Sequence, residues 1–253
     1  MPVHRETHPV TARFAEIRKA VAARYGPDSQ AVNFLLYEEL ISMRTLLSRD
    51  RTSAPVRTRI GQLVPDIQHR FLAGGALAPA RRLHRTVSMN PTIIEFDRRY
   101  FDAHYRRPLS SMDRRALLLR DRGQALKVLT SGASYLYAVD ELGALWVWPQ
   151  AFRLAEVMFG WAPGRPIEET RVVHPMLVPD RLRVRAAGEL VVVGSESGAF
   201  VTANLKSGHF RPPAQCAAET RRAAMRVLEL HDPADVDVFT MPRPATAAPT
   251  DGL

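Results

Sequence analysis

Apolar residues recur at helical spacing in three stretches near the beginning of the chain. The first stretch spans residues 11–25, the second begins at Asp28, and the third runs from about Pro55 to Phe71. Their apolar stripes are Phe14, Ile17, Val21 and Tyr25; Phe34, Leu35, Leu40, Ile41 and Leu47; and Ile60, Leu63, Val64, Ile67 and Phe71. Three amphipathic helices that pack as a small bundle are therefore expected within residues 1–75.

The following stretch predicts one more helix and then a change of period. Asn90 and Pro91 have the form of a helix cap and first turn, and apolar residues follow up to Tyr105, so a fourth helix is expected there. The segment 116–129 then fits either a continued helix or a hairpin. Because Gly123 falls between its two apolar runs, we prefer the hairpin.

The rest of the chain shows the pattern of antiparallel strands. Aromatic and β-branched runs flank a glycine-containing turn in 135–148, and two further apolar runs flank the turn sequence GSESG in 185–205. Each pattern predicts a hairpin. An amphipathic helix is expected after Pro213, and the run 236–241 predicts a last strand.

These elements predict an α+β fold with three regions. Residues 1–75 form a helical N-terminal region, which ends at the glycine pair and prolines near residue 75. Residues 76–241 form an α+β domain of antiparallel hairpins with a C-terminal helix. The tail 242–253 is rich in proline, alanine and threonine and is expected to be disordered.

Composition excludes several classes of protein. The 253 residues are 46% hydrophobic and 24% charged, which suffices for a sizeable core and excludes a wholly disordered chain. Cys216 is the single cysteine, so an internal disulfide and a cysteine cluster for zinc are excluded. No apolar run approaches the ~20 residues of a membrane span, and charges interrupt the start of the chain where a signal peptide needs an apolar core. A cytoplasmic protein without a membrane partner is expected.

The formal net charge of +9 favours an anionic partner. Most of the basic residues are arginine, an excess that codon bias also produces. Arginine-rich runs at 80–85, 96–101 and 112–117 fit either phosphate contacts or solvated helix faces. Nucleic acid therefore stays open as a partner.

The common signatures of metal and nucleotide sites are missing. The sequence has no HExxH and no His/Cys spacing typical of a metal site, so no metal is predicted. It also lacks a P-loop, a GxGxxG after a strand, and a GxSxG elbow. No motif identifies a cofactor, which stays unknown.

The segment 205–213 (LKSGHFRPP) is the main candidate site, because an apolar strand runs into a polar loop before two prolines open a helix. In the functional interpretation His209 moves a proton and Arg211 binds an oxyanion, while Ser207 and Gly208 complete the substrate-binding loop. In the structural interpretation His209 and Ser207 only hydrogen-bond the loop backbone, and Arg211 pairs with a carboxylate.

Two more residues are candidates for the same site. His174 ends a strand-like run and Glu189 lies inside another, so antiparallel pairing would bring both close to His209. His209 would then be the principal acid or base, His174 its partner and Glu189 the orienting carboxylate. A glutamate inside a half-buried strand more commonly faces solvent, which is the competing interpretation.

Several short motifs follow one another in a fixed order over about residues 95–240: LSSMDRRA, YLYAVDELGALWVW, HPML, RAAGELVVV and SGHFRPP. This order resembles the C-terminal region of the plant IQ-motif calmodulin-binding proteins called IQM, and a related module in bacterial toxin-like and effector-like proteins. The matching positions are His174, Ala186, Ala187, Gly188, Glu189, Ser207, Gly208, His209, Arg211 and Pro212. The resemblance implies that the two histidines and the glutamate share one site. Pro175 and Met176 replace the serines of the family, which argues against a hydroxyl-based mechanism there.

The leading hypothesis is an effector- or toxin-type enzyme, a transferase or hydrolase acting on an anionic small molecule, nucleotide-like or phosphorylated. One alternative is a non-enzymatic regulatory module whose helical N-terminal region binds a protein partner. The other is an arginine-rich nucleic-acid-binding protein. Convergence of His174, Glu189 and His209 in one open pocket would favour the enzyme, and separate positions in the core would count against it.

Overall fold

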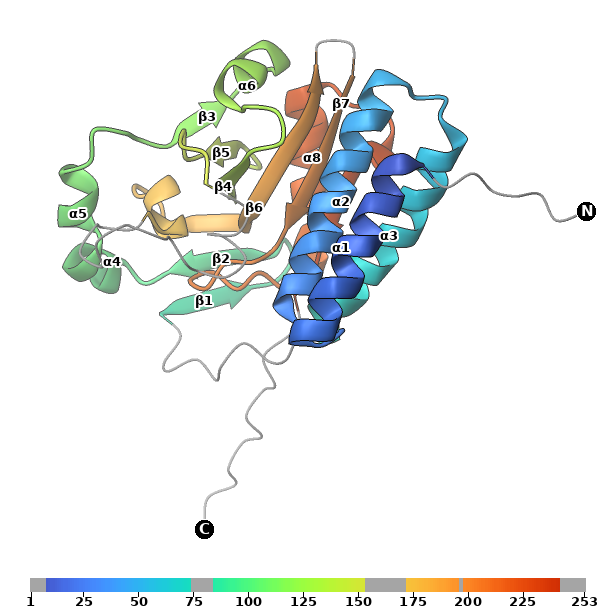
Figure 1. Ribbon diagram of the computed structural model, residues 1–253. Coiled ribbons are helices and arrows are strands. Elements are labelled where there is room, and N and C mark those ends of the chain that lie inside the picture. The colour runs from blue at the N-terminus through green and yellow to red at the C-terminus, as the bar shows by residue number, and fades with distance from the viewer. Residues whose placement is uncertain (1–7, 74–83, 153–171, 196–197, 242–253) are drawn as a thin grey trace, which may run out of the picture.

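The computed structural model describes residues 8–73, 84–152, 172–195 and 198–241 (Figure 1). Three long helices, α1 to α3, cover one face of a sheet, and helix α8 packs on the other face. The helices are α1 Pro9–Tyr25, α2 Gln30–Arg49, α3 Ala54–Ala73, α4 Arg98–His104, α5 Arg106–Ser110, α6 Arg122–Val128 and α8 Ala217–Leu228, with 3-10 turns η1 His174–Leu177, η2 Ala214–Cys216 and η3 Pro233–Asp235. The α+β fold expected from the sequence is confirmed.

The first three helices lie in the predicted stretches, but α1 begins at Pro9, before the predicted start at residue 11, and α2 begins at Gln30, after Asp28. Pro9 stands in the first turn of α1, where its missing N–H costs nothing, and Gly26 ends the helix with φ +91°. The side chain of Ser29 caps α2 by accepting a hydrogen bond from the Val32 amide. Helix α3 continues through Pro65.

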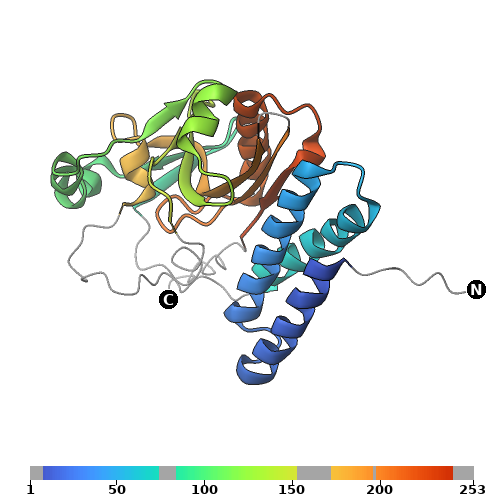
Figure 2. The same cartoon turned by 45° about the horizontal axis from the view of Figure 1, so that its top comes forward.

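The helical region shares its hydrophobic core with the sheet. Helix α2 is central, and its buried apolar side packs against strand residues that include Val191, Val193, Phe200 and Phe239. Figure 2 shows α1 to α3 along one side of the sheet. Within the predicted region 1–75, the described helices α1 to α3 thus contribute one layer of a larger packed unit.

Glu39 of α2 ties the three helices together. Its side chain is fully buried, and its carboxylate lies 2.6 Å from Arg18 Nη1 of α1 and 2.7 Å from Arg59 Nε of α3.

Replacing Glu39 by glutamine should lower the free energy of unfolding by about 2 kcal/mol, because both arginines lose their counter-charge. Urea denaturation measures this, with the exposed Glu16→Gln as control. Equal stability of the two variants would contradict the assignment.

A single eight-stranded sheet forms the middle layer of the described chain. Its path runs β1-β2-β6-β4-β5-β3, while β7 pairs with β6 and β8 pairs with β7. All pairs are antiparallel except β7–β8, which is parallel and is connected through α8. The strands are β1 Arg85–Ser88, β2 Ile93–Phe96, β3 Leu117–Leu119, β4 Ser134–Asp140, β5 Leu145–Val147, β6 Arg183–Ser195, β7 Gly198–Asn204 and β8 Val236–Phe239.

The later hairpins and the C-terminal helix are confirmed. Strands β4 and β5 form the hairpin expected in 135–148, and β6 and β7 form the one expected in 185–205. Helix α8 and strand β8 occupy the predicted positions after the proline pair. The tail 242–253, expected to be disordered, lies outside the described residues.

The predicted fourth helix is wrong at its start. Asn90 has φ +66° and, with Pro91, forms the turn between β1 and β2, so it does not cap a helix. Helix α4 begins only at Arg98, where the Asp97 side chain accepts from the Tyr100 amide. Burial alternates along β2, which is the period of a strand.

The hairpin predicted over residues 116–129 is also wrong in its second half. The first apolar run forms β3, which pairs with β5. The second run forms α6, because the Asp121 side chain caps the helix at the Gln124 amide. Gly123 therefore lies in the first turn of a helix and does not make a hairpin turn.

None of the described helices is both long enough and apolar enough to cross a membrane.

Candidate functional site

The SGHFRPP loop is held by hydrogen bonds within itself. Ser207 is buried, its hydroxyl accepts from the Phe210 amide at 3.2 Å, and its carbonyl accepts from the Arg211 amide at 2.8 Å. Phe210 is fully buried in the core, whereas Gly208 is exposed. Ser207 therefore shapes the turn, as the structural interpretation of this loop expects.

His209 and His174 lie near one another on one face of the sheet. Nε2 of His209 is 2.9 Å from the Tyr105 hydroxyl, and its ring packs edge-on against Phe96. Nε2 of His174 donates a 3.0 Å hydrogen bond to the carbonyl of Gly188. Burial lowers the pKa of each histidine to about 4, and for His174 the nearby His209 adds to the effect. Both imidazoles are therefore neutral near pH 7.

Glu189 points to the opposite face. Its neighbours Val191 and Val193 on β6 pack beneath the helical layer, and strand alternation places the Glu189 side chain on that same side. Its carboxylate accepts from Asn204 Nδ2 at 2.9 Å and lies close enough to Tyr37 of α2 to interact electrostatically. Burial raises the pKa of Glu189 to about 7, although Lys206 and the Asn204 hydrogen bond oppose the shift.

The predicted triad therefore does not converge in one pocket. His174 bonds the carbonyl of Gly188, one residue before Glu189, yet the sheet separates the two side chains. An acid/base pair oriented by this glutamate is not what the structure presents. The sequence correctly brought the three segments together but not their side chains.

Arg211 lies near a second arginine, Arg85, which was not among the predicted site residues. Burial lowers the pKa of Arg85, at the start of β1, and Arg211 is the next largest cause, which places the two guanidinium groups close together. The buried Nε and Nη1 of Arg85 and the buried Nη1 of Arg211 have no hydrogen-bond partner among the described residues. Arg211 also has φ +43°, a left-handed conformation that non-glycine residues adopt at a cost.

A polar hollow of about 260 Å³ lies beside Arg85 at the edge of the β1–β2 hairpin, and Arg211 is not part of its lining. Arg85, His84 and Arg98 line it together with the carboxylates of Glu95 and Asp97. Arg85 lies opposite Phe96 in the strand register, so it belongs to the face on which His209 packs. Arg85 ends the arginine-rich run 80–85, which is the only sequence signal that could have indicated it.

The neighbouring cysteine gives the arginine pair no negative charge. Burial raises the pKa of the Cys216 thiol to about 12, so the thiol stays protonated although it lies near Arg85. Among the described residues no group of histidine, cysteine and acidic side chains could hold a metal ion. The unsatisfied donors of the arginine pair therefore fit an anion and not a cation.

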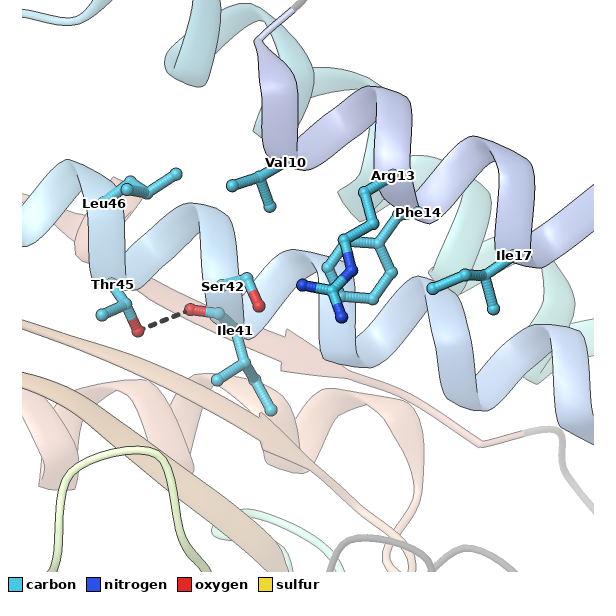
Figure 3. Close-up of a pocket in the computed structure, with 8 residues that line it drawn as sticks. All are labelled: Val10, Arg13, Phe14, Ile17, Ile41, Ser42, Thr45 and Leu46. Atoms are coloured by element: carbon cyan, nitrogen blue, oxygen red, sulfur yellow. Dashed lines mark hydrogen bonds between the residues drawn. The ribbon is translucent and has the colours of Figure 1, made fainter.

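A second hollow lies in the helical layer between α1 and α2 (Figure 3). Its volume is about 500 Å³, and its walls are mainly apolar, with Phe14 and Ile17 on α1 and Leu46 on α2. Arg13 and the hydroxyl of Ser42 supply polar groups at this hollow. Among its apolar side chains Ile17 is exposed, whereas Phe14 and Leu46 are half-buried. The protein partner expected at the helical N-terminal region stays a prediction.

Comparison with protein-family models, curated proteins and solved structures gives no match. The resemblance to the IQM proteins and to toxin-like modules therefore stays a prediction.

Proposed function

We propose that the protein binds an anionic ligand whose phosphate-like group is held between Arg85 and Arg211. The observation that carries the proposal is the set of three buried guanidinium nitrogens without a hydrogen-bond partner in the described chain. A buried N–H without a partner costs free energy, and two adjacent like charges add repulsion. A bound anion removes both costs at once.

A nucleotide or another phosphorylated small molecule fits this arrangement best. Two guanidinium groups offer planar, forked donors that match phosphate oxygens. The hollow of about 260 Å³ that Arg85 lines has room for part of a small ligand. The cytoplasmic location expected from the sequence is part of this proposal.

Binding, and not acid/base turnover, is the activity that the geometry favours. The transferase or hydrolase hypothesis needs Glu189 beside His174 and His209, and Glu189 lies on the other face of the sheet. Ser207 has a structural role in the loop, and among the predicted substrate-binding residues Arg211 is the one with an unsatisfied donor that supports ligand binding.

A thermal-shift series with pyrophosphate, nucleotides and sugar phosphates tests the proposal. A ligand at about 100 times its Kd stabilises the native state by about 2.7 kcal/mol, which raises the Tm of the wild type by several degrees. Arg85→Gln and Arg211→Gln should each abolish this shift. Without ligand both variants should be at least as stable as the wild type, because each removes one of two repelling charges.

Two controls separate binding at the arginine pair from the alternatives. Arg57→Gln, on the exposed surface of α3, should keep the full ligand-induced shift. His209→Ala should also keep it. Loss of the shift in His209→Ala, with an intact shift in Arg85→Gln, would overturn the proposal and return the site to the histidine pair.

A further inference from the structure

Basic side chains are concentrated on α4, α5 and the segment that follows. Residues 98–115 contain six arginines and two aspartates in a chain whose net charge is +9. Both views place α4 and α5 at the end of the molecule away from α1 to α3 (Figures 1 and 2). The charge excess is therefore local to one end of the protein.

Five of the six arginines are exposed, and Arg98 is half-buried. Arg98 and Arg115 donate to backbone carbonyls, and Arg106 pairs with Asp102. The side chains of Arg99, Arg107 and Arg114 belong to a surface made of two short helices and a loop. Such a surface suits contacts with successive phosphates of a flexible chain.

A stack of aromatic rings lies among these arginines. The Tyr100 ring stacks on His84 with centroids 3.7 Å apart, and the His104 ring lies 4.2 Å from Tyr100 at a tilt of 41°. His104 is exposed, so the stack ends at a ring that solvent reaches. Phe96 and Tyr105 support Tyr100 from the core side, which fixes the position of the stack.

We propose that the α4–α5 surface binds single-stranded nucleic acid, with a base stacked on the His84–Tyr100–His104 rings and phosphates held by Arg99 and Arg107. Stacking on aromatic side chains needs bases that are not paired, and arginines beside the stack hold the backbone of the same strand. A duplex presents phosphates but no free base face. The proposal goes beyond ligand binding at Arg85 and Arg211 and does not depend on it.

Fluorescence anisotropy with a labelled single-stranded RNA of about ten nucleotides, measured over a salt series, tests the surface. Arg99→Gln combined with Arg107→Gln should weaken binding about tenfold and reduce the slope of log K against log salt by about 1.4, the value for two phosphate contacts on a single strand. His104→Ala should weaken binding about fivefold with an unchanged slope, because it removes a stacking ring and leaves both arginines in place.

The matched control is Arg24→Gln combined with Arg49→Gln, which removes the same charge from exposed positions on α1 and α2. This control should bind as the wild type does. A loss equal to that of the α4–α5 double variant would show diffuse attraction and overturn the proposal. No binding of the RNA at low salt, or equal binding of a duplex of the same length, would overturn it as well. If Arg85→Gln binds the RNA as the wild type does but loses the thermal shift with nucleotides, the two sites are separate and both proposals are supported.

Discussion

Replacing Gly188 by alanine should lower the free energy of unfolding by more than about 4 kcal/mol. A Cβ atom at this position would lie 1.9 Å from the carbonyl oxygen of Asn204 and 3.2 Å from the Cα of Leu205. Both obstacles are backbone, so no side-chain rotation relieves the clash, and β6 must move away from the end of β7. Urea denaturation followed by circular dichroism measures the loss.

Gly208→Ala is the matched control for this prediction. Gly208 lies in the exposed part of the SGHFRPP loop, and a Cβ there meets nothing within 4 Å. Its stability should change by no more than about 0.5 kcal/mol. If Gly188→Ala proved as stable as Gly208→Ala, the close approach of the two strands would be wrong.

The close approach of β6 at Gly188 to the backbone at the end of β7 also explains the buried polar groups nearby. Tyr137 donates from its hydroxyl to the same Asn204 carbonyl, at 3.1 Å, and His174 donates to the Gly188 carbonyl. These bonds satisfy carbonyl oxygens that would otherwise be buried without a second partner. The histidine, the glycine and the loop after β7 therefore form one structural unit, which gives His174 a role that needs no catalysis.

The parts of the fold that the sequence predicted are those with local causes. The glycine stop at Gly26 and the alternating runs of β4 to β7 act within a few residues of the elements they define. The errors in secondary structure arose where the same residue type is common in two kinds of local structure. Asn90 is as suited to a left-handed turn as to a cap, and Gly123 is tolerated near the start of a helix that Asp121 caps.

The site could be predicted only in part, because the sequence pattern indicates which strands are neighbours but not on which face of the sheet each side chain lies. The sequence placed His174, Glu189 and the SGHFRPP loop in neighbouring segments, which the structure bears out. The face that Glu189 occupies depends on which side of β6 the helical layer covers, and no short motif encodes that. Arg85 lies near Arg211 because it is on the β1–β2 hairpin, and the turn of this hairpin at Asn90 was predicted to be the start of a helix.

Glu189→Gln should stabilise the protein by about 3 kcal/mol at pH 8 and by almost nothing at pH 4.5. Burial raises the pKa of Glu189 to about 7 in the folded state, whereas in the unfolded chain the carboxyl titrates near 4.5. The folded state therefore binds more protons between these values. The contribution of Glu189 is fully present below pH 4.5 and is lost as the pH rises through about 7.

Glutamine isolates this effect because it keeps the shape of the side chain and an oxygen that accepts from Asn204 Nδ2. The two buried histidines have lowered pKa values and destabilise the protein as the pH falls, but they do so equally in both proteins and cancel in the difference. Urea denaturation at intervals from pH 4.5 to 8 gives that difference directly, with Glu16→Gln as the exposed control.

A difference that grows with pH would show that Glu189 is charged beneath α2 at neutral pH and weakens the contact between the helical layer and the sheet. Tyr37 makes that contact from α2, and Arg44 stabilises it further along the helix through its 2.8 Å pair with Asp237. A difference independent of pH would mean that Glu189 reaches water or a stronger counter-charge, and that the helical layer is not docked on the sheet as the structure places it.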